Sequence, residues 1–306
     1  MPLVAFVINR ALLRDPPRFV RRCREAAAER GWEPRFARTT EAGNGLAAAP
    51  SELAGTALVF AAGGDGTVRA CAEALAGTGV PLAIVPLGTA NLTARALGVP
   101  SRAGRAVDAG FDGRDHRIDL AVADAIGTGP ASAAGAAAGG IGFAAMAGIG
   151  LDAAVVSAAG PQAKARLGWM AYAVSGVAHL SLPPRDFTIR LDGGAPLTRR
   201  ARCVVVGNAG LLPGGFVLLP AARLDDGLLD VGVLAPAGLP GWVRLAGLVV
   251  TRSRRRDRQL ERFQARRVEI STGTDVPRQI DGEMIAPGRT LSVSVCPGAL
   301  TVRRPA

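Results

Sequence analysis

The chain has 306 residues, of which 49% are hydrophobic and 20% charged, so it is long enough for two domains with packed cores. Its net charge of +11 favours an anionic partner, such as nucleic acid, an anionic membrane surface or a nucleoside triphosphate. Aromatic residues make up only 4% of the chain and no recognition motif is evident, which argues against a nucleic-acid-binding protein.

Cysteine usage and apolar runs bear on the cellular compartment. The four cysteines lie far apart without a CxxC pair, which argues against a zinc site or a disulfide framework and favours the cytoplasm. The N-terminal residues lack the features of a signal peptide and are expected to form a first strand. The uncharged run Ala125–Leu151 contains many glycines and Pro130, so we expect two strands and a loop rather than a membrane span.

The first third of the chain alternates strand-like and helical patterns. Apolar runs predict strands at residues 3–9, 34–39, 57–62 and 82–86. Between them, helical spacing predicts one helix from Pro16 to Gly31, one that ends at Gly77, and a short one that stops at Gly98. Repeated strand–helix units of this length predict a parallel, doubly wound sheet.

From about Arg117 onward, short strand-like segments dominate. Turn signals at Asp192-Gly193-Gly194, Asp226-Gly227 and Pro287-Gly288 separate these segments, a pattern typical of a β-sandwich or barrel. Two helical stretches interrupt the pattern, near Leu151–Tyr172 and Leu239–Arg256. We therefore expect two domains, residues 1–119 and 120–306, with a ligand cleft between them. The last residues of the chain either stay with the second domain or pack back on the first.

The stretch VFAAGGDGTV, residues 59–68, leads an apolar strand into three glycines and one acid. Bare backbone at Gly63, Gly64 and Gly66, followed by a helix N-terminus, predicts a cradle for phosphate. The spacing fits neither a dinucleotide fingerprint nor a Walker loop, and a tight turn with an Asx-type cap is the simpler alternative. Asp65 has no basic partner nearby in sequence, so we expect it to act through a metal ion or a water network.

Several motifs extend this interpretation. GGDGTVR, residues 63–69, resembles the GGDGT motif of lipid kinases, NAD kinases and phosphofructokinases, and PLGTAN, residues 86–91, resembles the PLGT(G/A)N motif of diacylglycerol kinase-like lipid kinases. Further matches follow in the family's order: RIDL at 117–120, GIGLDA at 148–153, VGNAGLLPGG at 206–215, PAARLDDGLLDV at 220–231 and IDGE at 280–283. The resemblance implies an N-terminal doubly wound parallel sheet of the NAD kinase and phosphofructokinase type, with a C-terminal β-sandwich domain.

The resemblance also implies roles for single residues. Glu283 would be the general base that accepts the proton of a lipid hydroxyl, with Asp65 and Asp119 in the same acidic network. ATP would be held by Asn9, Thr40, Gly63, Gly64, Asp65, Gly66, Thr67, Val68, Arg69, Thr89 and Asn91. A structural Mg²⁺ would take the Asp226 carboxylate and the backbone carbonyls of Arg223 and Leu228. Read without the family, IDGE is a hairpin turn with a solvated glutamate and the Asp226-Gly227 pair is a simple turn.

The implied function is that of an ATP-dependent kinase acting on a hydroxyl group of a diacylglycerol- or sphingosine-like lipid. The enzyme would be cytoplasmic, peripheral at the inner membrane surface, independent of nucleic acid, and a candidate homodimer. The alternative is a non-catalytic protein that binds nucleotide and lipid. Two departures from the family favour it: Arg10–Leu13 replaces the usual NPxSG loop, and Leu92 stands where many bacterial members have aspartate. An NAD kinase-like enzyme is a third reading, against which PLGTAN, the DDG loop and DGE argue.

A basic segment in the second half suggests a second surface. Arginines at Arg252–Arg258 follow an apolar helix that contains Trp242, Leu245, Leu248 and Val249. An apolar helix face beside guanidinium groups is typical of docking to an anionic membrane. The alternative is a solvated helix end, where arginines interact favourably with the helix C-terminus.

Overall fold

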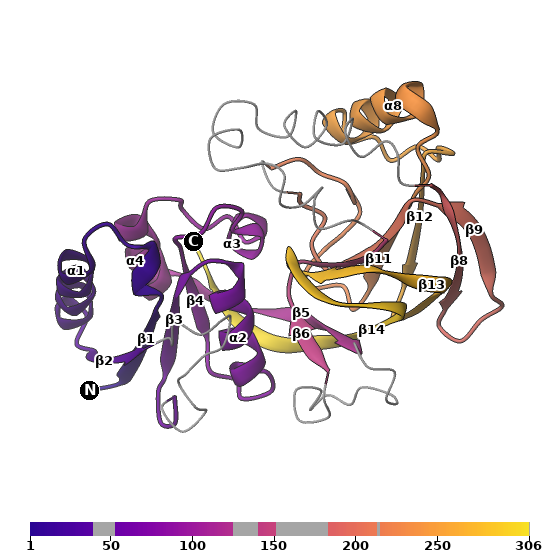
Figure 1. Ribbon diagram of the computed structural model, residues 1–306. Coiled ribbons are helices and arrows are strands. Elements are labelled where there is room, and N and C mark those ends of the chain that lie inside the picture. The colour runs from indigo at the N-terminus through magenta and orange to yellow at the C-terminus, as the bar shows by residue number, and fades with distance from the viewer. Residues whose placement is uncertain (39–52, 125–139, 151–182, 213–214, 306) are drawn as a thin grey trace. The chain divides into compact units, whose positions relative to one another are not determined.

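The computed structural model describes residues 1–38, 53–124, 140–150, 183–212 and 215–305 (Figure 1). The chain divides into two compact units. Unit 1 comprises Met1–Leu120 together with Pro297–Ala306, and unit 2 comprises Ala121–Cys296. In the described ranges, no helix has the length and apolarity needed to cross a membrane.

Unit 1 is built on a parallel sheet. The strands β1 (Leu3–Ile8), β2 (Glu33–Arg38), β3 (Leu58–Gly63) and β4 (Leu82–Pro86) lie in the order β2-β1-β3-β4. All three pairings are parallel, and β1 and β3 are almost wholly buried. The last residues of the chain extend this sheet, because Val302 pairs in parallel with Leu82 of β4. The predicted parallel, doubly wound sheet is confirmed.

Helices cover this sheet. They are α1 (Pro16–Glu29), α2 (Asp65–Leu75), α3 (Leu92–Ala96) and α4 (Ala103–Asp112). α1 begins where the sequence predicts, because the Asp15 side chain accepts the N–H of Arg18 and Pro16 and Pro17 occupy the first positions. It ends before Gly31, whose φ of +71° suits glycine. α4 was not among the predicted helices; it packs beside α1 on one core with β1, β3 and β4.

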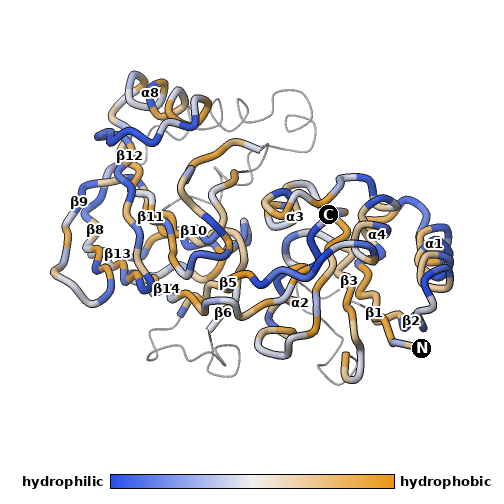
Figure 2. Tube along the Cα trace, turned by 180° about the vertical axis from the view of Figure 1, so that it is seen from behind, coloured by the Kyte–Doolittle hydropathy of each residue, from blue (hydrophilic) through white to orange (hydrophobic). Residues whose placement is uncertain are grey.

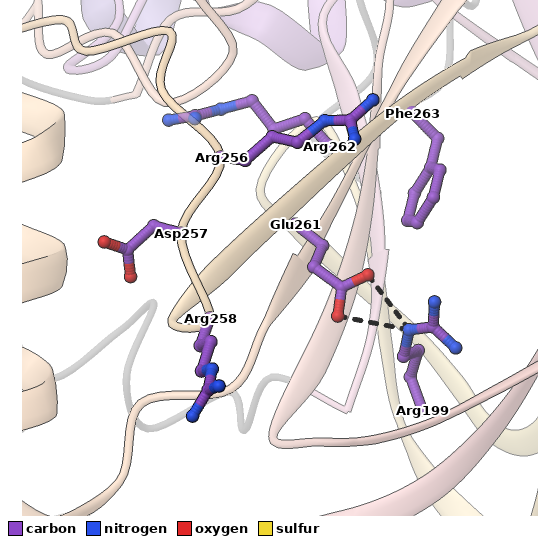
Figure 3. Close-up of a pocket in the computed structure, with 7 residues that line it drawn as sticks. All are labelled: Arg199, Arg256, Asp257, Arg258, Glu261, Arg262 and Phe263. Atoms are coloured by element: carbon purple, nitrogen blue, oxygen red, sulfur yellow. Dashed lines mark hydrogen bonds and ion pairs between the residues drawn. The ribbon is translucent and has the colours of Figure 1, made fainter.

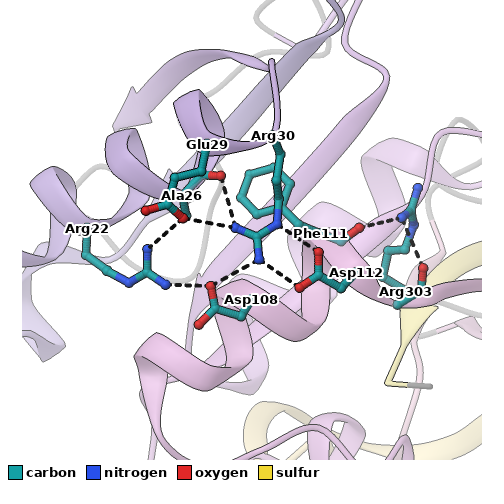
Figure 4. A network of polar contacts seen from close by, with 9 residues as sticks. Arg22, Ala26, Glu29, Arg30, Asp108, Phe111, Asp112 and Arg303 are labelled. Atoms are coloured by element: carbon teal, nitrogen blue, oxygen red, sulfur yellow. Dashed lines mark hydrogen bonds and ion pairs between the residues drawn. The ribbon is translucent and has the colours of Figure 1, made fainter.

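Polar contacts join α1 to α4 (Figure 4). Arg22 pairs with Asp108, and Arg30 at the end of α1 pairs with both Asp108 and Asp112. The Arg30 guanidinium lowers the pKa of the Asp112 carboxyl. These contacts lie mostly at the surface, so they orient the two helices more than they stabilise the fold.

Unit 2 is a β-sandwich domain. Its strands are β6 (Ile141–Phe143), β7 (Met146–Ile149), β8 (Arg185–Leu191), β9 (Leu197–Ala201), β10 (Cys203–Gly207), β11 (Leu229–Leu234), β12 (Leu260–Ala265), β13 (Arg267–Ile280) and most of β14 (Glu283–Arg304); the end of β5 (Arg114–Asp124) pairs with β6. The order β12-β11-β10-β7-β13 is antiparallel throughout. β13 pairs with β8 through its first half and with β7 through its last residues, and a register shift separates the two. The bulge lets one strand serve both sides of the core.

Three expectations beyond residue 120, and one for Thr40 in the first domain, need correction or fall outside the described residues. Pro287-Gly288 does not form a turn, because both residues lie within β14 and Gly288 pairs with Val276. A Cβ at Gly288 would lie 2.7 Å from the Arg278 guanidinium carbon, so any larger residue there would require the Arg278 side chain to shift. The predicted helix at Leu151–Tyr172, most of the run Ala125–Leu151 and Thr40 lie outside the described residues.

The helix predicted at Leu239–Arg256 is shorter than expected. The structure has α8 at Gly238–Val250, and its last turn contains no basic residue. Arg252 has a φ of +51°, a left-handed backbone conformation that ends the helix before the run of arginines. The arginines therefore follow the helix as an irregular segment. The alternative interpretation, in which they lie in the last turn and interact with the helix C-terminus, is wrong.

Candidate active site

The glycine loop joins β3 to α2 in unit 1. Gly63 ends the buried strand, Gly64 is the N-cap of α2, and the first helical hydrogen bond runs from the Val68 N–H to the Gly64 carbonyl at 3.1 Å. The N–H groups of Gly66 and Thr67 precede that bond, so no carbonyl of the helix accepts them. Free N–H groups at the positive end of a helix dipole make this loop suited to bind an anion.

Glycine is required here partly for packing. A Cβ at Gly63 would lie 2.2 Å from Thr67 Oγ1, and a Cβ at Gly88 would lie 2.6 Å from the Gly64 Cα. The β3–α2 loop and the loop after β4 therefore pack backbone against backbone. The Leu87 N–H also donates to the Gly63 carbonyl at 2.9 Å, so the two sequence motifs form one structural element.

Asp65 has a protein partner that its sequence neighbours did not predict. Its Oδ1 accepts the N–H of Leu92 at 2.7 Å, at the first residue of α3. Burial raises the pKa of Asp65, while backbone hydrogen bonds from Leu92, Asn91 and Thr93 lower it. The acid of the glycine loop thus caps the helix that follows the PLGTAN loop.

Asn91 closes the PLGTAN loop on itself. Its side chain accepts the Gly88 N–H at 3.0 Å and donates to the Gly88 carbonyl at 2.7 Å. Its φ of +48° is a left-handed conformation that asparagine tolerates better than most residues. Both side-chain groups bond within the loop, so Asn91 shapes the loop, and the exposed Thr89 is the side chain that the loop presents.

The remaining described residues expected to bind the nucleotide are Asn9, Val68 and Arg69, and they differ in which groups are available for binding. Asn9 accepts the N–H of Ala11 through Oδ1 and caps a 3-10 turn, Arg10–Leu12, that replaces a glycine-rich loop. Val68 is 4% exposed and its N–H is used in the helix, so neither group is available to a nucleotide. Arg69 is half-buried at the start of the second turn of α2.

Asp119 holds the returning end of the chain within unit 1. It is 2% exposed, and its Oδ1 accepts the Gly298 N–H at 2.7 Å. Nearby, Arg117 donates to the Gly298 carbonyl at 3.0 Å. The two contacts fix Gly298, whose φ is +57°, where β14 joins the sheet of unit 1.

Glu283 begins β14 in unit 2, directly after a tight turn. Asp281 and Gly282 have φ values of +49° and +83°, which is the backbone of a two-residue type I′ hairpin. Glu283 pairs with Ile280 across the hairpin and is half-buried. The hairpin reading of IDGE is therefore correct for the backbone, and it is compatible with a reactive carboxylate on the first strand residue.

Two residues that the sequence did not single out anchor this hairpin. Asp281 is 7% exposed, and its Oδ1 accepts the N–H groups of Ala145 and Met146 at 3.2 and 2.8 Å. The 6% exposed Gln279 accepts the Gly282 N–H at 2.8 Å. An Asp-Gly pair in a hairpin signals the turn, but only the fold shows that this aspartate is buried against β7.

The loop at 223–228 offers oxygen ligands. Asp226 is exposed, and its Oδ1 accepts the Leu228 N–H at 3.1 Å in an Asx turn. The pKa of the neighbouring Asp230 is raised to about 6, chiefly by burial and also by the charge of Asp226, against the lowering effect of the hydrogen bond from Gln264. Among the described residues, no three His, Cys, Asp or Glu side chains gather as a metal cluster, so a cation here would depend on backbone carbonyls.

The structure thus brings Gly63, Gly64, Asp65 and Asn91 together in unit 1, and it places Glu283 at the start of β14 and Asp226 in a loop, both within unit 2. The convergence of Asp65 with Glu283 stays a prediction.

Comparison with known proteins covers both units. Residues 3–123 match the model of the diacylglycerol kinase catalytic domain, and residues 145–304 match the YegS C-terminal NAD kinase beta sandwich-like domain. A Pseudomonas fluorescens protein named "Probable lipid kinase YegS-like" is 33% identical over 292 residues, which cover 94% of this chain and 90% of that protein. A Mycobacterium tuberculosis protein named "Diacylglycerol kinase" is 31% identical over 268 residues, covering 85% and 80%.

Solved structures share the fold. A diacylglycerol kinase from Bacillus anthracis superposes with a TM-score of 0.71 at 21% identity and covers 99% of this chain and 96% of its own. An NAD kinase from Archaeoglobus fulgidus in complex with ATP superposes with a TM-score of 0.53 at 11% identity, covering 99% and 94%. The fold expected from the motifs, a doubly wound sheet followed by a β-sandwich domain, is confirmed.

Proposed function

The chain belongs to the diacylglycerol kinase-like family of lipid kinases, and from that premise we propose that it transfers the γ-phosphoryl group of ATP to a hydroxyl group of a diacylglycerol- or sphingosine-like lipid. The observation that carries the proposal is the cradle between β3 and α2. There the free N–H groups of the helix N-terminus meet a second glycine loop at backbone contact.

The nucleotide phosphates would lie on that cradle. The N–H groups of Gly66 and Thr67 and the exposed Thr89 hydroxyl are the donors that the loops offer, and Arg69 adds a charge at the start of the second turn of α2. Asp65 and Asn91 serve the same purpose indirectly, because their side chains hold the second loop in place. Thr40 lies outside the described residues and remains part of the proposal from the family resemblance.

The chemistry would require one proton acceptor. As the lipid oxygen bonds to the γ-phosphorus, the bond from phosphorus to the bridging oxygen of ADP breaks, and Glu283 takes the hydroxyl proton. A hairpin fixed by Asp281 and Gln279 suits this task, because general base catalysis depends on a carboxylate held in one position.

The loop at 223–228 fits a hard cation in the chemistry of its donors. Asp226 and the carbonyls of Arg223 and Leu228 are all oxygen ligands, which Mg²⁺ prefers. The charge of Asp226 already raises the pKa of Asp230, so positive charge at this loop would offset a repulsion. When bound, magnesium supplies charge neutralisation, here to the carboxylates of the loop and in kinases generally to the phosphates.

The test is transfer of labelled phosphate from ATP to a panel of diacylglycerol, sphingosine, ceramide and NAD. We expect a labelled lipid with the native chain and a rate about 10² to 10⁴ lower with Glu283→Gln, because the amide cannot accept the proton. Glu25→Gln is the matched control, since Glu25 lies exposed on α1 in unit 1. Equal rates for the native chain and Glu283→Gln would remove the general base from the proposal.

Two further outcomes would replace the proposal. ATP binding without transfer to any lipid would establish a non-catalytic nucleotide-binding protein. Label in NAD alone would establish a soluble-metabolite kinase.

A further inference from the structure

The outer face of α8 is apolar and exposed. Of the six large hydrophobic residues that are exposed in the described part of the chain, three lie on this helix: Leu239 (56%), Val243 (65%) and Val250 (52%). At 3.6 residues per turn they fall within an arc of about 40° on the helix. The opposite face, with Leu245 and Val249, is buried in a core that includes Leu260 of β12. α8 therefore has one side that packs on the described part of unit 2 and one apolar side whose large side chains are exposed.

The chain that follows α8 is strongly hydrophilic (Figure 2), and its sequence is strongly basic. Residues 252–258 contain five arginines and a single acid, Asp257. Asp257 is engaged by Arg244 of α8 at 2.7 Å, so it does not neutralise the segment. Apart from Arg244, α8 carries no charged residue. A hydrophobic stripe thus borders directly on a cationic segment.

A cavity of about 440 Å³ lies at this segment (Figure 3). Its lining is formed by Arg199, Arg256, Asp257, Arg258, Glu261, Arg262 and Phe263. The two acids are paired, because Glu261 binds Arg199 at 2.9 Å and Asp257 binds Arg244. In the described ranges, no carboxylate lies within ion-pair distance of Arg256 or Arg258. The cavity therefore has an excess of guanidinium groups.

Arg262 adds a second sign that an anion belongs there. Its Nε donates to the Leu218 carbonyl at 3.3 Å and its Nη1 to the Arg255 carbonyl at 3.4 Å. Its Nη2 is buried and has no hydrogen-bond acceptor among the described residues. A buried donor without an acceptor is unfavourable, and an oxyanion is the acceptor that a guanidinium prefers.

We infer that the α8 surface, defined here as the exposed face of α8 together with residues 252–258 and their cavity, docks on an anionic phospholipid bilayer. The apolar stripe lies at the boundary of the acyl chains, and the arginines bind the headgroup phosphates, one of them in the cavity. Apolar side chains beside guanidinium groups match both layers of a membrane surface. A nucleic acid would use the arginines alone and would leave Leu239 and Val243 in water.

The experiment is co-sedimentation of the full chain with vesicles of phosphatidylcholine, alone or mixed with phosphatidylglycerol. Neither ATP nor a substrate lipid is present, so failure of the proposed kinase function would leave the result unchanged. We expect binding to the mixed vesicles that weakens with salt. The double variant Arg256→Ser with Arg258→Ser should bind about fivefold more weakly for each arginine removed.

Matched variants separate surface chemistry from total charge and from folding. Arg102→Ser with Arg105→Ser removes the same charge from exposed positions of unit 1 and should bind like the native chain. Leu239→Ser with Val243→Ser should weaken binding while leaving the thermal midpoint unchanged, because both side chains are exposed. Native-like vesicle binding by Arg256→Ser with Arg258→Ser overturns the inference, as does an equal loss in the unit 1 control. Binding to a DNA duplex in place of vesicles overturns it as well.

Discussion

Asp65 accepts the backbone N–H of Leu92 at 2.7 Å, and this contact joins the two glycine loops of unit 1 into one element. The first residue of α2 thereby caps α3. Because both loops belong to the proposed phosphate cradle, the contact links the position of one loop to that of the other.

Replacing Asp65 should separate its role as an acceptor from its role as a charge. Asp65→Ala removes the acceptor and leaves the Leu92 N–H unpaired, which should lower the free energy of unfolding by about 1 kcal/mol. Asp65→Asn keeps an oxygen acceptor at the same position and, at about pH 4, should unfold close to the native chain. Urea denaturation followed by circular dichroism measures the difference. Equal destabilisation by both variants would show that charge, not capping, is what the position contributes.

The raised pKa of Asp65 predicts a pH dependence of stability. Because burial raises the folded-state pKa above the ordinary aspartate value of about 3.9, the folded protein holds this proton more tightly than the unfolded chain. The contribution is fully favourable below that value and is lost as pH rises through the folded pKa. Asp65→Asn has no such proton, so it should gain stability relative to the native chain as pH is raised from about 4 toward neutrality. A difference between the two proteins that stays constant with pH would contradict this.

Gly88 should not tolerate alanine. A Cβ there would lie 2.6 Å from the Gly64 Cα, which is backbone and cannot rotate away. We expect Gly88→Ala to lose about 1 to 3 kcal/mol of stability and to bind ATP more weakly, because the two loops must move apart. Gly104→Ala is the control: a Cβ there meets nothing within 4 Å, and α4 should be unchanged or slightly more stable. Calorimetric titration with ATP and thermal melting measure both effects, and a native-like Gly88→Ala protein would refute the packing argument.

Asp281 should act as a positioning residue for Glu283. Asp281→Ala leaves the Ala145 and Met146 N–H groups unpaired and puts alanine at a φ of +49°, so we expect a loss of about 2 to 3 kcal/mol in stability. If Glu283 is the base, kcat should fall while KM for ATP stays within about twofold, because the nucleotide cradle lies in unit 1.

Asp281→Asn is the rescue variant for that prediction. Asparagine keeps the oxygen acceptor and tolerates the left-handed backbone, so most of kcat and of the stability should return. Activity lost equally in both variants would assign Asp281 a direct role in place of positioning.

Local patterns predicted much of unit 1. The apolar runs, the Asp15-Pro16-Pro17 start and Gly31 placed β1 and α1 within one or two residues, because strand burial and helix capping are decided by neighbours in the chain. Turn and helix signals in unit 2 were less reliable. Pro287-Gly288 reads as a turn but lies inside β14, where pairing with β13 overrides the local preference. The apolar pattern through Val250 reads as continuing into the arginines, yet the backbone of Arg252 ends α8 first.

The amino-acid sequence by itself determined the order of strands and helices, the glycine loops and the family to which they belong, since each depends on residue types at short spacing. Only the tertiary structure decided which groups those residues bind. Asp65 meets a backbone N–H 27 positions away, Asp281 one 135 positions away and Asp119 one 179 positions away. These hydrogen-bond partners depend on how the strands pair and on how the end of the chain joins the sheet of unit 1. A buried carboxylate must find a donor wherever the fold supplies one, and no local spacing encodes that choice.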